Sequence, residues 1–227
     1  TPDKPQEFKE CVKVQNPDGG WSKESHTDKT SMWITTFVGL KLCRGNLVLK
    51  DPDIQKKHGE PDKTYPGAVC YYNLPPMAPL AEKLKQHIRP FLDFDIVETY
   101  RYARLYGMGD KLDIHVDRGA CFVSVSVCFG YDYNDFLKPG QAWALGALDR
   151  KADDSETEII FNLQPGQGML YPGCSAPHWR DVFLGQHCGQ AFFHYVPTDD
   201  AVFEEFMEDT ETKKKRLAEA GGEAKKN

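Results

Sequence analysis

The sequence predicts a mainly β domain of the jelly-roll type with flanking α-helices. Its central part, residues 96–196, contains six short runs that are rich in β-branched and aromatic residues. Turn sequences built on Gly and Pro separate these runs, for example Gly107-Met-Gly-Asp110 and Gln164-Pro-Gly-Gln-Gly168. Many short strands with turns between them are typical of a β-sandwich or barrel.

The N-terminal part of the chain begins with a polar stretch. Residues 1–31 contain the turn sequence Asn16-Pro-Asp-Gly-Gly20, which predicts an arm outside the fold. Two later runs, 33–38 and 46–50, have the β-branched, aromatic and aliphatic residues of strands. The charged residues 51–63 that follow are expected to form a loop or a short helix.

One amphipathic helix is predicted before the central strands. From Pro79 to Arg89 the apolar residues recur at helical spacing, and Pro90 ends the pattern. The residues of this apolar face are Leu80, Ala81, Leu84 and Ile88. Because they share one face, we expect the helix to pack against the rest of the domain.

The central runs are the core of the prediction. They are 96–106, 112–115, 121–129, 158–163, 169–171 and 190–196. The third run alternates as a strand lining a barrel should. After Thr198 an apolar stripe at helical spacing predicts a C-terminal helix. We therefore expect an arm over 1–31, one domain over 32–218 and a disordered tail over 219–227.

The composition narrows the class of protein. The chain has 227 residues, with 34 acidic and 28 basic side chains, and its net charge is −6. An acidic protein lacks the positive field that nucleic-acid binders use, so nucleic acid is a disfavoured partner. The apolar runs are only a few residues long, whereas a membrane helix needs about 20, so no membrane span is expected. The oligomeric state is left open.

Seven cysteines are spread along the chain, an odd number that includes no Cys-x-x-Cys pair. This pattern favours neither a disulfide scaffold nor a thiolate zinc cluster. We expect reduced, mostly buried thiols, and therefore a reducing compartment such as the cytoplasm.

Three histidines are followed two residues later by an acid, in the pairs His26/Asp28, His58/Glu60 and His115/Asp117. Residues i and i+2 of a strand point the same way, so an imidazole and a carboxylate at this spacing can share a metal ion. Such a site needs rigid, packed elements. The first pair lies in the predicted arm and the second in the charged stretch, whereas His115 ends a predicted strand. The third pair is therefore the candidate.

A non-haem iron site of the two-histidine, one-carboxylate type needs one more imidazole and keeps positions open for substrate chemistry. The candidates are His178, His187 and His194. His178 follows a turn and lies 63 residues after His115, far enough to return on the opposite strand of a barrel. His187 lies in a Gly-flanked turn. His194 lies inside a predicted strand, where a core position is favoured over a position in the cavity.

These residues resemble a family when they are taken together. Four segments carry the resemblance: Tyr106 to Arg118, Leu163 to Tyr171, His178-Trp-Arg180, and Gln190 to Tyr195. In content and order they are similar to the iron(II)/2-oxoglutarate-dependent dioxygenases, and most of all to the prolyl 4-hydroxylase-like branch with its compact bacterial and viral members. The resemblance covers about residues 97–196.

The resemblance implies a double-stranded β-helix whose mouth holds Fe(II) on His115, Asp117 and His178. It also implies 2-oxoglutarate and O2 as cosubstrates, with succinate and CO2 as products, and ascorbate as a further candidate cofactor. The expected reaction is hydroxylation of an aliphatic carbon. The favoured substrate is a prolyl residue in a protein or peptide, or a free amino acid.

The cosubstrate site departs from the family pattern. Tyr106 matches the tyrosine that binds the distal carboxylate of 2-oxoglutarate, but His187 and Cys188 stand where the family carries Lys or Arg. Because a buried carboxylate needs a cation or several donors, another residue must replace it. Arg180 is the first choice, since it lies two residues after His178 on the same strand. The alternatives are Arg118, His187 and His194.

The sequence also leaves the substrate entrance and two other functions open. Trp143, Trp179 and Arg104 are candidates for the substrate entrance, although packing roles are favoured for the two tryptophans. A second enzymatic hypothesis is an AlkB-like nucleic-acid demethylase that acts on a flipped base, which the net acidity disfavours. A third is a non-catalytic metal-binding jelly-roll module, which the missing cation favours.

Overall fold

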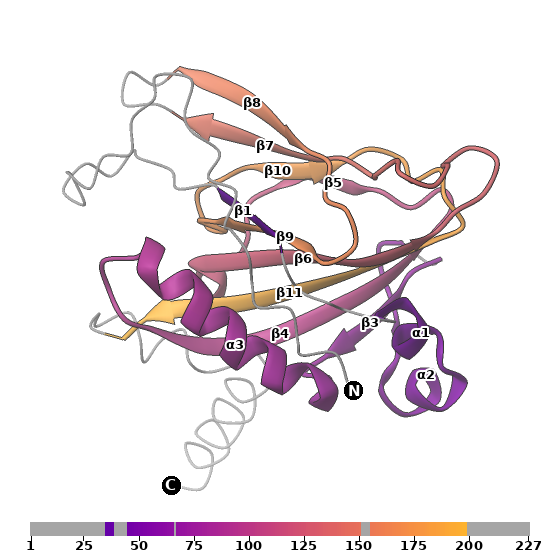
Figure 1. The fold of residues 1–227 in the computed structure, drawn as a ribbon, viewed down its shortest axis with the longest axis horizontal. Coiled ribbons are helices and arrows are strands. Elements are labelled where there is room, and N and C mark those ends of the chain that lie inside the picture. Colours follow the sequence, from indigo (N-terminus) through magenta and orange to yellow (C-terminus); the bar gives the residue numbers. More distant parts are fainter. Residues whose placement is uncertain (1–34, 39–44, 66, 151–154, 199–227) are drawn as a thin grey trace, which may run out of the picture.

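The computed structural model describes residues 35–38, 45–65, 67–150 and 155–198. Two β-sheets face each other, and the longest of the described helices lies on the outer side of the larger sheet (Figure 1). The strands are β1 (Thr35–Val38), β2 (Glu60–Pro61), β3 (Val69–Tyr72), β4 (Ile96–Gly107), β5 (Leu112–His115), β6 (Val123–Asp132), β7 (Leu145–Arg150), β8 (Glu156–Phe161), β9 (Gln167–Tyr171), β10 (His178–Arg180) and β11 (His187–Pro197). The helices are α1 (Gly45–Lys50), α2 (Pro52–His58) and α3 (Ala78–Ile88), with short 3₁₀ turns at Pro75–Met77, Arg89–Phe91 and Gly119–Cys121.

The larger sheet has the strand order β1-β9-β6-β11-β4-β3-β2, and the smaller sheet has the order β5-β10-β7-β8. Every strand pair in them is antiparallel. Strands far apart in the sequence therefore lie side by side, as β4 and β11 do at the centre of the larger sheet. Two antiparallel sheets with these crossovers form a jelly roll, so the predicted mainly β class is confirmed.

Helix α3 covers the outer face of the larger sheet. Successive strand residues point to opposite faces, and one set, which includes Ala103 of β4 and Phe193 of β11, packs with the apolar face of α3 in one buried cluster. The buried residues of α3 are Ala81, Leu84 and Ile88. The helix predicted over residues 79–89 is thus confirmed, and it anchors the sheet that carries part of the site.

The inner face of the larger sheet meets the smaller sheet in a second buried cluster. It includes Tyr106 of β4, Cys188 of β11 and Tyr171 of β9, packed with Leu145 and Ala147 of β7. The polar residues that point the same way along these strands are therefore enclosed between the two sheets. This enclosed space is where the candidate site lies.

One predicted strand is wrong: residues 46–50 belong to helix α1. The run has the residue types of a strand, but the Tyr71 hydroxyl donates to the Leu49 carbonyl oxygen and Leu49 is buried in the core. Asp51 then caps helix α2 by accepting from the backbone N–H groups of Asp53 and Ile54, at 2.9 and 3.1 Å. Tertiary packing and a cap override the weak local strand preference.

Strands β2, β3 and β7 are absent from the prediction. Strand β7 contains Gly146, which weakens a strand signal in the sequence. The structure supplies the reason for this glycine, because a Cβ atom there would lie 2.4 Å from the indole of Trp179. The predicted arm, the C-terminal helix after Thr198, the tail, Cys11, His26 and Cys43 lie outside the described residues.

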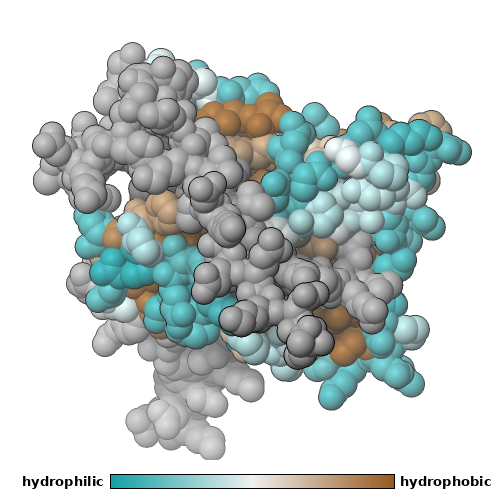
Figure 2. All heavy atoms as spheres, in the orientation of Figure 1, coloured by the Kyte–Doolittle hydropathy of each residue, from teal (hydrophilic) through white to brown (hydrophobic). Residues whose placement is uncertain are grey.

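On the face in Figure 2, hydrophobic areas of the coloured surface are broken up by hydrophilic ones. None of the described helices has the length and apolar character needed to cross a membrane. The five described cysteines, 70, 121, 128, 174 and 188, form no disulfide.

Candidate functional site

The structure brings His115, Asp117 and His178 together at one end of the space between the sheets. His115 and His178 are directly paired across β5 and β10, with ring centroids 4.3 Å apart. Asp117 follows β5, and its N–H donates to the carbonyl oxygen of Gly173 at 2.8 Å. Its Oδ1 lies 3.6 Å from Nε2 of His115 and 3.8 Å from Nε2 of His178. One ligand atom from each residue therefore converges on a common point, within 4.8 Å of the others.

Backbone carbonyls orient both imidazoles. Nδ1 of His115 lies 2.8 Å from the oxygen of Asp113, and Nδ1 of His178 lies 2.9 Å from the oxygen of Ala176. A carbonyl can only accept a hydrogen bond, so Nδ1 carries the proton in each ring. The lone pair then resides on Nε2, the atom that faces Asp117. Metal-binding histidines commonly donate their other ring N–H to a carbonyl oxygen in this way.

The protonation states also suit a cation. Burial raises the pKa of the Asp117 carboxyl, but the hydrogen bond with His115 and the nearby imidazoles outweigh burial and hold this pKa below its ordinary value. Burial lowers the pKa of His178, which keeps the ring neutral at pH 7. The hydrogen bond with Asp117 raises the pKa of His115. The His115 side chain is 38% exposed and that of His178 only 4%, so the cluster opens to solvent on the His115 side.

Arg180 is a buried cation with no counterion among the described residues. It is 2% exposed and donates to the Trp143 carbonyl oxygen at 2.6 Å and to Oε1 of Gln190 at 3.3 Å. Its guanidinium also lies 5.0 Å from the ring centroid of Trp143. Nε has no hydrogen-bond partner, and no carboxylate in the described part of the chain forms an ion pair with this side chain. Because a buried unpaired charge is costly, the arrangement indicates an anionic ligand.

Tyr106 lies beside Arg180 in the same interior. Its ring packs edge-on against Trp143, with centroids 4.9 Å apart. Its hydroxyl accepts a hydrogen bond from Arg104 at 3.2 Å, and burial raises its pKa, so the hydroxyl keeps its proton. Arg104 is itself paired with Asp62 at 2.6 Å. The Tyr106 proton is thus available for a further acceptor, and the two residues proposed from the sequence for the cosubstrate meet around one indole ring.

Strand β6 adds a buried hydroxyl, that of Ser126, to this interior. Ser124 donates to Oδ2 of Asp117 at 3.1 Å, and Cys128 is paired in register with Gln190, the partner of Arg180. Ser126 lies between them on the same face of the strand, and its buried hydroxyl has no hydrogen-bond partner. The unpaired buried hydroxyl of Ser126 lies between Arg180 and the cluster of His115, Asp117 and His178, and it marks the same space as the unpaired Nε.

The other residues considered for the cosubstrate have different surroundings. Arg118 lies with its guanidinium 4.6 Å from the ring centroid of Tyr100. His187 lies 3.1 Å from Oδ2 of Asp132, which also pairs with Lys50 at 2.6 Å. His194 is buried, with Nδ1 3.0 Å from the Ser124 hydroxyl. Among these residues, only Arg180 contacts Trp143, through a hydrogen bond to its carbonyl oxygen and a guanidinium over its ring.

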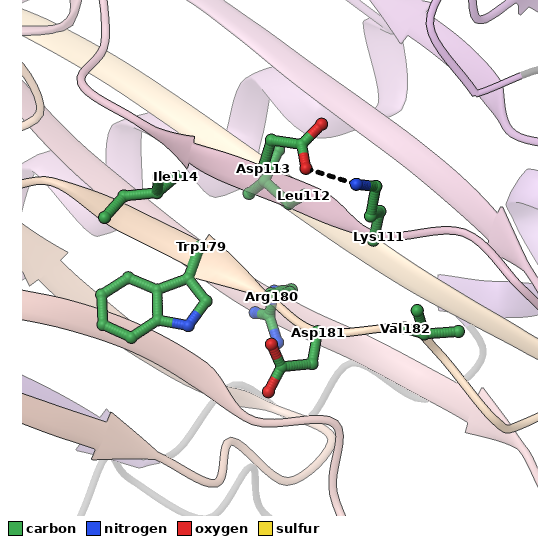
Figure 3. A pocket seen from close by; sticks show the side chains of 8 residues that line it. All are labelled: Lys111, Leu112, Asp113, Ile114, Trp179, Arg180, Asp181 and Val182. Carbon is green, nitrogen blue, oxygen red and sulfur yellow. Dashed lines mark ion pairs between the residues drawn. The ribbon is translucent and has the colours of Figure 1, made fainter.

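The three candidates for the substrate entrance also have different surroundings. Trp143 is buried between the sheets and Arg104 is enclosed by tyrosines, with Tyr65, Tyr102 and Tyr106 at 5.9, 5.4 and 5.2 Å. Trp179 lies on the opposite side of β10 from His178 and Arg180, over Gly146. There it lines a pocket of about 370 Å³ between β5 and β10, together with Ile114 and the Lys111–Asp113 ion pair (Figure 3). Trp179 therefore faces away from the cluster of His115, Asp117 and His178.

An aromatic strip extends from the cluster along the inner face of the larger sheet. Ring centroids are 4.5 Å apart for His194 and Tyr100, 6.4 Å for Tyr100 and Tyr72, and 4.7 Å for Tyr72 and Tyr102. Phe192 continues it, 5.7 Å from Tyr102. Tyr72 is 56% exposed, so the strip reaches the surface.

Sequence reasoning missed several of these residues. Ser124, Ser126 and Gln190 are polar side chains at inward positions of otherwise apolar strands, and that alternation was a usable signal. Asp62 carried no such signal, because it lies outside any strand and meets Arg104 only in the folded chain.

Comparisons with known proteins support the fold. Neither a protein-family model nor a curated protein matches the chain. Among solved structures, an oxidoreductase of the 2OG-Fe(II) oxygenase family from Burkholderia pseudomallei is 10% identical, with a TM-score of 0.51 over 71% of this chain and 83% of the other. A Pseudomonas putida prolyl-4-hydroxylase is 16% identical, with a TM-score of 0.50 over 72% and 92%. The non-heme alpha-ketoglutarate-dependent carbocyclase SnoK from nogalamycin biosynthesis is 5% identical, with a TM-score of 0.52 over 76% and 85%. The chain thus has the double-stranded β-helix fold of these oxygenases.

Proposed function

We propose that this protein is an Fe(II)- and 2-oxoglutarate-dependent dioxygenase that hydroxylates an aliphatic carbon. Its proposed substrate is a prolyl residue in a protein or peptide, or a free amino acid. The observation that carries the proposal is one strand, β10, which presents His178 to the metal-ligand cluster and, two residues later, a buried Arg180 without a counterion. The oxygenase fold is the frame in which these side chains lie.

The proposed metal ligands are His115, Asp117 and His178. Two neutral imidazoles and one carboxylate are a donor set that suits Fe(II) and leaves positions open for other ligands. Bound iron with 2-oxoglutarate supplies O2 activation, with succinate and CO2 as products. The protein contributes fixed ring orientations through the carbonyl oxygens of Asp113 and Ala176.

Arg180 and Tyr106 are the proposed partners of the distal carboxylate of 2-oxoglutarate. Nε of Arg180 and the Tyr106 hydroxyl are the donors left without an acceptor by the surrounding protein. Residues i and i+2 of a strand are separated by about 6.6 Å, which is comparable with the reach of a five-carbon diacid from the metal. A carboxylate here neutralises the buried guanidinium, and charge-assisted hydrogen bonds hold it in place.

The interior also excludes water from the reaction. Trp143, Phe183 and Tyr131 are buried and pack against one another near Arg180, with centroids 4.9 Å apart for Trp143 and Phe183. A closed wall of aromatic side chains protects a reactive oxidant from side reactions.

The proposed substrate approaches from the solvent-exposed His115 side. The aromatic strip from Tyr100 to Tyr72 offers flat apolar faces on which a pyrrolidine ring can pack. One of the structures with the same fold is a prolyl-4-hydroxylase, which supports a prolyl substrate. The unpaired thiols of the described cysteines support a reducing, cytoplasmic location.

Two assays test the proposal. Under nitrogen, Fe(II) and 2-oxoglutarate should produce a weak visible charge-transfer band, and in air the protein should convert 2-oxoglutarate to succinate, with and without ascorbate. His178→Ala should abolish both signals, because the metal loses a ligand. Prolyl peptides and free amino acids, offered as substrates, should gain the mass of one oxygen atom. Absence of both the band and succinate in the wild-type protein would refute the proposal.

A further inference from the structure

The two oxygens of Asp117 face two different groups of side chains. Oδ1 faces the Nε2 atoms of His115 and His178, at 3.6 and 3.8 Å. Oδ2 accepts a hydrogen bond from Ser124 at 3.1 Å, on the side where β6 and β11 lie. The cluster of His115, Asp117 and His178 thus uses only one side of this carboxylate.

A second set of ligand atoms surrounds this carboxylate. The Sγ atom of Cys121, a ring nitrogen of His194 and a carboxylate oxygen of Asp117 lie within 4.8 Å of one another. We call these three residues the inner cluster. Cys121 is 1% exposed and His194 is 4% exposed, so both are enclosed by protein.

The surroundings hold the inner cluster in place. Ser124 contacts both Nδ1 of His194, at 3.0 Å, and the carbonyl oxygen of Cys121, at 3.1 Å. The hydroxyl of Tyr100 lies 3.1 Å from the Cys121 sulfur, and its ring packs on His194. The mechanism proposed above uses neither Cys121 nor His194, yet both reach the carboxylate that it depends on.

We propose that Asp117, Cys121 and His194 form a second metal site, which takes a thiophilic divalent cation such as Zn²⁺. Thiolate, imidazole and carboxylate are the ligands that zinc combines in tetrahedral sites, and a water molecule or the Ser124 hydroxyl can complete the four. On binding, the S–H bond of Cys121 breaks, its proton leaves to solvent and an S–metal bond forms, with no change of oxidation state. The carboxylate and the thiolate together balance the charge of the cation. The positive charge of Arg118, which lies over the Tyr100 ring, repels the cation and weakens its binding.

The inner cluster and the proposed iron site share Asp117, and this sharing gives the second site a consequence. A cation in the inner cluster draws electron density from the Asp117 carboxylate and pulls it toward Cys121 and His194. The carboxylate then binds iron more weakly, while the two imidazoles of the iron site are unchanged. Zn²⁺ in the inner cluster is therefore expected to weaken Fe(II) binding and to inhibit turnover, and this consequence alone rests on the proposed function.

Cobalt distinguishes the two sites because only the inner cluster contains sulfur. Anaerobic titration of the metal-free protein with Co²⁺ should develop a thiolate-to-cobalt charge-transfer band in the near ultraviolet. Cys121→Ser should remove this band. His115→Ala, which removes a ligand of the proposed iron site but none of the inner cluster, should keep the band. Cys174→Ser, a matched change of a nearby thiol outside the inner cluster, should also keep it. A wild-type protein without the band, or a band that survives in Cys121→Ser, would overturn the second site.

X-ray absorption of the zinc-loaded wild-type protein needs no variant, so it remains decisive if Cys121→Ser does not fold. One sulfur neighbour at about 2.3 Å, with nitrogen or oxygen as the other neighbours, is the expected first shell. A shell of nitrogen and oxygen alone would contradict the second site. The succinate assay with Fe(II) contains no zinc, so a failure here is separate from a failure of the oxygenase proposal.

Discussion

At the scale of single residues, Arg180 has the largest influence on the proposed chemistry. Cys188 occupies a position where the sequence resemblance leads one to expect a cation, and it is fully buried against Gln190, which donates to its sulfur at 3.1 Å. Gln190 also accepts from Arg180, so the guanidinium reaches the same interior from strand β10 on the opposite sheet. The interior between the sheets therefore contains a positive charge, although β10 supplies it rather than β11.

Replacing this charge should weaken cosubstrate binding. With redox-silent Mn²⁺ present, we expect Arg180→Gln to lower the affinity for 2-oxoglutarate about 10- to 100-fold, because a hydrogen bond to a charged group contributes about 1.5–3 kcal/mol. Isothermal titration calorimetry measures this. Arg118→Gln is the matched control and should bind 2-oxoglutarate like the wild type. The reverse ranking of the two variants would assign the carboxylate to Arg118.

His194 should make the stability of the metal-free protein depend on pH. Burial lowers its pKa to about 4, below the value near 6.5 expected for the unfolded chain. Between these values the unfolded state binds a proton that the folded state does not, so the free energy of unfolding falls as the pH falls. Urea unfolding should show that the wild type loses about 2 kcal/mol more between pH 7 and pH 5 than His194→Gln does. Equal losses in the two proteins would contradict this assignment.

At the scale of elements, the turn between β9 and β10 positions two of the proposed metal ligands. The Gly173 carbonyl oxygen accepts from the N–H of Asp117, and His178 begins the strand that follows the turn. A Cβ atom on Gly173 would lie 2.3 Å from the Cys121 carbonyl oxygen and 2.6 Å from Oδ2 of Asp117. Real Cβ atoms do not come that close, so any side chain here must displace the turn or the carboxylate.

Gly173→Ala should therefore weaken metal binding, because it displaces Asp117. We expect at least a tenfold loss of Mn²⁺ affinity, because a small misplacement of a ligand costs a metal site much of its binding energy. Electron paramagnetic resonance of free Mn²⁺ measures this loss. Gly107→Ala is the control, since its Cβ would make only ordinary contacts, the nearest at 3.5 Å. Equal affinities in the two variants would show that the turn adapts without moving Asp117.

The edge strand β5 shows how neighbouring elements protect the site. The backbone N–H of Asp113 donates to the Tyr65 hydroxyl at 3.2 Å, and its carbonyl oxygen accepts from His115. At Asp113, the backbone N–H and C=O groups of this edge strand are thus hydrogen-bonded to side chains of the same chain. Such engagement limits pairing with another chain and also fixes the imidazole of His115.

At the scale of the whole molecule, ligand binding should stabilise the fold by mass action. With Mn²⁺ bound, 2-oxoglutarate at 100 times its dissociation constant should add about 2.7 kcal/mol. For a domain of this size that corresponds to a rise in Tm of roughly 5–10 °C, which differential scanning fluorimetry measures. Single-stranded DNA, the control, should leave Tm unchanged because the chain carries a net charge of −6.

The pattern of outcomes separates the three hypotheses about function. A rise in Tm with 2-oxoglutarate, together with succinate formation, supports the oxygenase. Tight metal binding without any response to 2-oxoglutarate would favour the non-catalytic module. A shift caused by DNA would favour the demethylase.

Much of the fold was accessible from the sequence, because its main signals are local. Helix α3 and strand β5 lie where periodicity and turn residues predicted them. The failures have tertiary causes. Residues 46–50 became helical when Leu49 entered the core, and β7 was missed because Gly146 makes room for Trp179, whose position the sequence does not reveal.

The sequence by itself determined the alternation of the strands, the turns between them and the spacing of His115 and Asp117, since each depends on residues a few positions apart. Only the tertiary structure decided that His178 faces His115, that Arg180 is buried with no counterion among the described residues, and that Cys121 and His194 reach the same Asp117. These facts depend on the register between strands from distant parts of the chain and on burial. Both arise from packing of the whole domain, which no local pattern encodes.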